Sequence, residues 1–118
     1  MSFKPGVPLD PLLADAIRIA DEARRWMGSE GRALIDALPP PARVQANAEM
    51  LATTARLMAI IAWLLHPAQK QGRMPPFNPP HELPLGPGHP LEASAGHDIA
   101  RASRALAARL QTAPVQAP

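Results

Sequence analysis

The stretch VQANAEMLATTARLMAIIAWLL, residues 44–65, decides the fold of this chain. Large apolar residues and alanines recur in it at alternating steps of four and three positions. We call this set the heptad row, and it consists of Val44, Ala48, Leu51, Ala55, Met58, Ala62 and Leu65. Such steps place every member on one face of an α-helix. The stretch therefore predicts a long helix, and we expect the heptad row to be buried.

The second half of this helix is apolar on its other sides as well, through Leu57, Ile60, Ile61 and Leu64. Two neighbouring helices of a small bundle cannot shield a helix that is apolar nearly all round. We therefore expect a homodimer or another protein partner. The residues that we assign to this protein-interaction surface or dimer seam are Arg56, Leu57, Met58, Ile60, Ile61, Trp63 and Leu64.

Prolines and glycines delimit the neighbouring helices. Asp10 followed by Pro11 is typical of a helix start, because aspartate accepts free amide hydrogens and proline fits the first turn. Gly28 and Gly31 are expected to end that helix by accepting a left-handed conformation. Pro67 removes an amide donor, so the central helix should kink or restart there. The predicted helices span about 10–27, 32–38 (a short helix) and 42–71.

Seven prolines fall among the seventeen residues 74–90, which predicts an extended connector with polyproline character. A last helix is expected over about 92–112, with Ile99, Leu106 and Leu110 on its apolar side. No segment shows the alternation of a strand. The sequence therefore predicts one all-α domain over residues 1–118, a three-helix bundle with a long proline-rich connector between the second and third long helices.

Composition narrows the function classes. The chain has no cysteine, which excludes disulfides and thiol chemistry and suits the cytoplasm. The sequence lacks a signal-peptide pattern, and its longest apolar run, from Leu57 to Leu65, is shorter than a membrane span. We therefore expect a cytoplasmic protein that does not enter membranes.

Few polar residues are candidates for chemistry. The four histidines match no helical face and have no carboxylates grouped with them, so we expect no metal and no cofactor. Thr53 and Thr54 lack a neighbouring base, and we expect no enzymatic activity. Glu49 and Arg56, two turns apart, could hold a polar contact with a partner helix. For Glu49 the pattern favours an exposed charge instead, whereas Arg56 is the better interface candidate. Trp26 is expected to pack against Trp63.

The last predicted helix is locally basic, and it supports an alternative function. Arg101, Arg104 and Arg109 form a possible partner-docking surface there, or a surface for nucleic acid. The missing aromatic residues and the net charge of only +2 disfavour nucleic acid. The alternative is a small helical nucleic-acid-associated regulator.

Three stretches of the chain resemble the RcdA family, the alphaproteobacterial regulators of CtrA degradation. EMLATTARLMAIIAWLL, residues 49–65, resembles the family's signature helix through its Arg-Leu-Met and Trp-Leu-Leu groups. EARRWMGSEGRALIDALP resembles the first helix and its glycine-arginine turn, and DIARASRALAARL resembles the last helix. The chain departs from the family pattern at Ala52, Ala55, His66 and Pro67.

The resemblance implies a dimeric three-helix bundle without enzymatic activity. It also implies an adaptor that helps to deliver cell-cycle regulators to the ClpXP protease, together with companion adaptors or cargo. The resemblance thus implies that this protein acts in regulated proteolysis.

Overall fold

A computed structural model describes residues 9–79, 82 and 84–112, and the regular structure within these ranges is helical. The expected all-α class is therefore confirmed. Residues 80, 81 and 83 of the expected connector lie outside the described residues. The elements are α1 (Leu9–Met27), α2 (Glu30–Asp36), α3 (Pro40–Leu65), the 3-10 helix η1 (Pro67–Gln71) and α4 (Ala95–Thr112).

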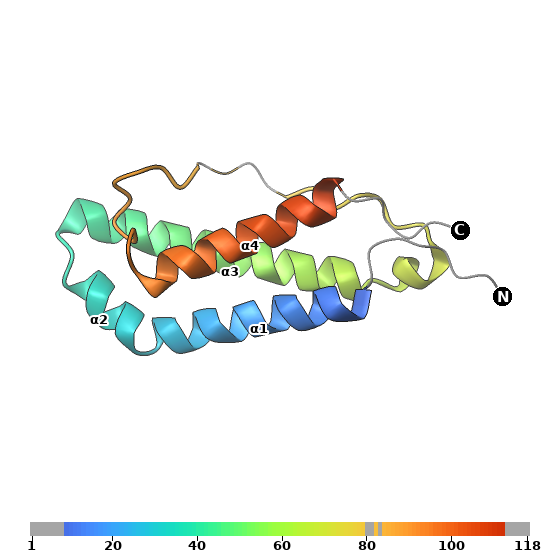
Figure 1. The fold of residues 1–118 in the computed structure, drawn as a ribbon, viewed down its shortest axis with the longest axis horizontal. Helices are drawn as coiled ribbons and strands as arrows, with labels where there is room; N and C mark the ends of the chain where they lie inside the picture. The colour runs from blue at the N-terminus through green and yellow to red at the C-terminus, as the bar shows by residue number, and fades with distance from the viewer. Residues whose placement is uncertain (1–8, 80–81, 83, 113–118) are drawn as a thin grey trace.

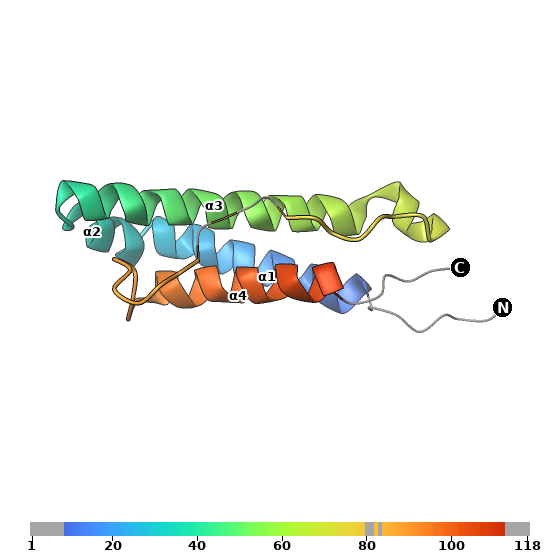
Figure 2. The ribbon, with the colours of Figure 1, turned by 90° about the horizontal axis from the view of Figure 1, so that it is seen from above.

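The three long helices lie side by side along one axis, and each contacts the other two (Figures 1 and 2). α3 and α4 run in the same direction, and α1 runs against both. The short helix α2 lies at the end where α1 finishes and α3 begins. Because α4 starts at that same end, the chain between η1 and α4 has to return along the length of the bundle.

Prolines set both ends of α3. Pro40 and Pro41 occupy its first turn, where their missing amide hydrogens have no helical acceptor to lose. At the other end Pro67 stops α3 at Leu65, and the chain restarts as η1, in agreement with the kink or restart expected there within residues 42–71. η1 ends at Gly72, whose left-handed backbone has a φ of 65°.

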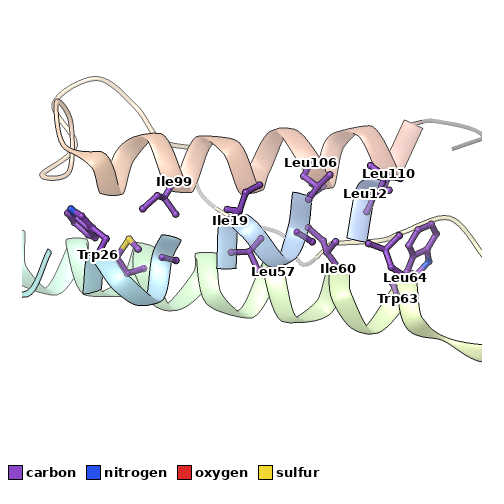
Figure 3. Packing of buried hydrophobic residues seen from close by; sticks show 14 of the residues in the cluster. Leu12, Ile19, Trp26, Leu57, Ile60, Trp63, Leu64, Ile99, Leu106 and Leu110 are labelled. Carbon is purple, nitrogen blue, oxygen red and sulfur yellow. The ribbon is translucent and has the colours of Figure 1, made fainter. Parts of the chain in front are cut away.

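The core of the bundle is apolar and runs along its length (Figure 3). α3 contributes Leu57, Ile60 and Leu64 to this core, and they pack among side chains of α1 and α4. This is the face opposite the heptad row. The expectation that the heptad row is buried was therefore wrong for the single chain, because two helices cover only one side of α3. Other labelled core residues are Leu12, Ile19, Ile99, Leu106 and Leu110.

The two tryptophans lie at opposite ends of the core, so the expected contact between Trp26 and Trp63 is absent (Figure 3). Because α1 and α3 are antiparallel, the last turn of α1, which carries Trp26, lies far from the end of α3, which carries Trp63. Trp63 instead packs edge to face against Phe77, with 6.0 Å between the ring centroids. The Trp63 Nε1 donates a hydrogen bond to the Pro75 carbonyl oxygen at 2.9 Å. These contacts hold the start of the connector against α3.

Trp26 packs against two glycines, one from α2 and one from α4. A Cβ atom built on Gly31 or on Gly96 would lie 2.4 Å from the Trp26 ring, well inside contact distance. Gly31 is therefore needed for close approach and lies inside α2, and its backbone is not left-handed. The expected left-handed ending of α1 at Gly28 and Gly31 was wrong in this respect.

Candidate interaction surface

The heptad row forms an exposed stripe along α3. Its four large members are Val44, Leu51, Met58 and Leu65, and they are 69%, 73%, 60% and 62% exposed. The alanines between them are exposed as well. Scattered apolar residues are ordinary on a protein surface, but a continuous row over the whole length of a helix is typical of an interaction site.

A groove between α1 and α3 widens this apolar surface. Ile17 of α1, which is 52% exposed, lines it together with Met27, Leu57 and Met58. The groove has a volume of about 490 Å³, and Asp21 of α1 also lies along it. Asp21 accepts a hydrogen bond from Arg24 at 2.6 Å, and this contact lowers the pKa of the Asp21 carboxyl. The apolar surface is thus shared by two helices.

The structure places the sequence-predicted seam residues on two different sides of α3. Met58 is exposed and Ile61 is partly buried, so a partner could reach both. The other five are buried within the single chain, where they build the core or the polar cluster described next. They are Arg56, Leu57, Ile60, Trp63 and Leu64.

A cluster of charged side chains is buried between α3, α4 and the connector. Arg56 is 1% exposed, and its Nε donates to Glu82 Oε2 at 2.9 Å while its Nη2 pairs with the other carboxylate oxygen. Nη2 also lies 3.7 Å from Glu49 Oε2, and Nη1 donates to Ser103 Oγ. Arg104 completes the cluster by donating to Glu49 Oε1 at 2.8 Å. Two guanidinium groups thus balance two carboxylates.

The sequence favours an exposed charge at Glu49, and this expectation is wrong because the residue is 8% exposed. The alternative was a polar contact of Glu49 and Arg56 with a partner helix. The structure brings these two residues together, and the helix that they meet is α4 of the same chain. The sequence reasoning missed Glu82. The available signal was that a single acidic residue interrupts an otherwise uncharged, proline-rich segment from Met74 to Gly88.

Electrostatics of the cluster favour a structural role. Burial lowers the pKa of the Arg56 guanidinium, and the charge of Arg104 lowers it further while Glu49 opposes both effects. Arginine nevertheless stays protonated in proteins, so this group cannot serve as an acid or base near neutral pH. The cluster joins Glu82 of the connector to both α3 and α4.

His89 lines a small cleft beside this cluster, together with Glu49, Glu82 and Arg104. Burial is the main reason that the pKa of His89 is lowered, although the charge of Glu49 opposes this. Its Nδ1 accepts a hydrogen bond from the Leu91 amide at 3.1 Å, which requires the neutral ring. Among the described residues, no three histidine, aspartate or glutamate side chains converge as metal ligands.

The three arginines of α4 do not form one basic surface. Arg104 pairs with Glu49 in the cluster, whereas Arg101, one turn earlier, is exposed. Arg109 is exposed and lies 4.0 Å from Asp15 of α1. This leaves too little positive charge on one face to favour a nucleic-acid surface.

α3 is long and apolar enough to cross a membrane, judged by length and composition alone. The run of nine residues considered from the sequence understated this, because the small residues before it are also weakly apolar. About half of the most apolar part of α3 is buried within the bundle. A core helix of a folded domain has the same properties, so they do not identify a membrane span.

Comparison with known proteins gives one match. A family model described as "Protein of unknown function (DUF1465)" matches residues 6–85, which is more than half of the chain. The chain belongs to this family. The DUF1465 match includes the whole heptad row and Glu82, whereas α4 with Arg104 lies beyond it. Neither a curated protein nor a solved structure matches the chain.

Proposed function

We propose that this DUF1465 protein is a three-helix bundle, with a proline-rich connector, that acts as a non-enzymatic protein-binding adaptor in the cytoplasm. We also propose that it works as a homodimer. The observation that carries the proposal is the exposed heptad row on α3, whose large members are 60–73% exposed. The opposite face of α3 is packed into the core, so the row is free to bind a partner without unfolding the chain.

The size of the heptad row is sufficient for self-association. Complete burial of one valine, leucine or methionine side chain contributes about 1.5–3 kcal/mol, so each large member of the row, already part-buried, would add about 1–2 kcal/mol. Two copies contribute eight such side chains, or roughly 8–16 kcal/mol in total. Association itself costs about 4–15 kcal/mol, and a dimer therefore becomes favourable once most of the row is buried.

The resemblance to the RcdA family suggests the cellular process in which the adaptor would act. The Arg-Leu-Met and Trp-Leu-Leu groups carry that resemblance. Arg56, Leu57, Trp63 and Leu64 are buried in the single chain, whereas Met58 and Leu65 are exposed members of the heptad row. The buried residues preserve a fold, so the resemblance supports a shared bundle, and its two exposed residues lie on the proposed interaction surface. On this basis we propose delivery of substrates to ClpXP, with companion adaptors or cargo as partners.

A pull-down with immobilised full-length protein tests the adaptor proposal. The assay offers purified ClpX, ClpP and cell-cycle cargo, with and without companion adaptors. We expect at least one of these components to be retained. If the wild-type dimer retains none of them, the proposed role in ClpXP delivery is refuted.

Light scattering tests the dimer, and the chain offers a matched pair of variants. Leu51→Lys introduces a charge into the heptad row, whereas Ala105→Lys introduces the same charge at an exposed position of α4. We expect the wild type and Ala105→Lys to have the mass of a dimer at micromolar concentration and Leu51→Lys to have that of a monomer. A monomeric wild type would refute the dimer.

A further inference from the structure

We infer that two copies of this chain pair through α3 in antiparallel orientation, with the alanines of one heptad row facing the large residues of the other. This inference rests on the proposed dimer and specifies its geometry. It follows from the alternation of small and large residues along an exposed helix face, and from the absence of charge on that face.

The alternation decides the orientation. Large residues occupy one heptad position (Val44, Leu51, Met58 and Leu65), and alanine occupies the other at each step between them. In a parallel pair of helices, equivalent positions face each other, so layers of two large residues would alternate with layers of two alanines. Such layers require different helix separations, and the alanine layers would leave gaps.

An antiparallel pair removes this conflict, because each alanine position of one helix then faces a large-residue position of the other helix. Every layer combines one alanine with one large residue, and one helix separation of about 8–10 Å suits all layers. Two registers satisfy the rule. In the first, Val44, Ala48 and Leu51 face Ala62, Met58 and Ala55 of the second copy. In the second, displaced by one heptad, Ala48, Leu51 and Ala55 face Leu65, Ala62 and Met58.

The surroundings of the row suit a second copy of the same chain. The positions that flank it on α3 carry no charge, so two identical faces meet without repulsion. These flanking residues are Gln45, Asn47, Ala52, Thr54, Ala59 and Ile61. The two charged residues in this part of α3, Glu49 and Arg56, point into the bundle and pair with each other and with residues of the same chain. The row spans 22 residues, or about 33 Å, which permits six layers.

Cysteine cross-linking distinguishes the orientations, because the chain has no cysteine of its own. A disulfide needs Cα atoms within about 7 Å. In an antiparallel pair, the two copies of residue 44 are at least 18 residues apart along the axis, or about 27 Å, whereas in a parallel pair they face each other. Val44→Cys, Ala62→Cys, Ala48→Cys and Leu65→Cys each replace an exposed side chain.

The experiment oxidises each single-cysteine protein alone and then two mixtures, Val44→Cys with Ala62→Cys and Ala48→Cys with Leu65→Cys. We expect no covalent dimer from Val44→Cys alone or from Leu65→Cys alone, and a covalent dimer from one of the mixtures. Light scattering of the same samples before oxidation reports whether the copies associate at all.

The outcomes separate this inference from the proposed function. Cross-linking of Val44→Cys or Leu65→Cys to itself shows a parallel pair and overturns the inference while the dimer stands. A dimer by light scattering that cross-links in neither mixture places the interface elsewhere, which also overturns it. A monomer refutes the proposed dimer and this inference together. If that monomer sediments with phospholipid vesicles, the row binds a lipid surface instead.

Discussion

Replacement of Arg56 by methionine is the most direct test of the buried cluster. Methionine has a similar length and fills much of the same space, so the change removes the charge with little loss of packing. Glu49 and Glu82 then remain buried with Arg104 as their one nearby cation among the described residues. Arg104 Nη2 lies 3.8 Å from Glu82 Oε1, too far to replace the two contacts that Arg56 makes with this carboxylate.

Removal of one partner of a buried ion pair costs about 3–5 kcal/mol, because a charge is left without compensation. For a domain of this size, such a loss lowers the melting temperature by about 12–20 °C. Urea unfolding followed by circular dichroism near neutral pH measures the free energy of unfolding.

The matched control is Arg109→Met. Its ion pair with Asp15 has the same chemical groups, but they lie 4.0 Å apart and both side chains are about half exposed. Exposed pairs contribute about 0–1 kcal/mol, so this variant should unfold close to the wild type. If Arg56→Met costs no more than Arg109→Met, the buried cluster does not stabilise the fold.

Two further predictions concern other parts of the bundle. Gly96→Ala should lower the free energy of unfolding by about 1–3 kcal/mol, because the added methyl group overpacks against Trp26. This loss exceeds the gain of up to about 1 kcal/mol in helix propensity. Gly86 has open space around it, so Gly86→Ala should be neutral or slightly stabilising in thermal melts. Equal melting temperatures of the two variants would contradict this packing. The lowered pKa of His89 means that, as the pH falls, the unfolded chain takes up a proton before the folded chain does. The free energy of unfolding should therefore fall as the pH drops below about 6.5. His89→Gln should make this fall shallower in urea unfolding. An unchanged slope would show that the ring is not held neutral by its contact with Leu91.

The helices of this fold are readable from the sequence because their signals are local. The prolines at residues 39–41 and Pro67 act on their own helix turns, and they place the ends of α3 within a few residues. The apolar spacing also reveals two apolar faces on α3. The spacing cannot show which face meets α1 and α4, because both faces carry suitable side chains and the choice depends on the other helices.

Contacts across the bundle are beyond such local signals. Glu82 is 26 residues from Arg56, and nothing in the proline-rich segment fixes where that carboxylate will lie. Gly96 lies in the first turn of α4, and nothing in the sequence indicates that it packs against Trp26. The sequence therefore predicts correctly that one side of α3 is left unshielded. It assigns that side largely to residues that the fold buries.

The ion pair of Glu82 also changes the entropy of the long connection. Twenty-nine residues separate the end of α3 from the start of α4, and closing a flexible loop of that length costs about 3 kcal/mol. Phe77 and Glu82 attach this connection to the bundle at intermediate points, so α4 is tethered by shorter free segments. The ion pair between Arg56 and Glu82 therefore shortens the free segment that leads to α4, which lowers the entropic cost of packing α4 against α3.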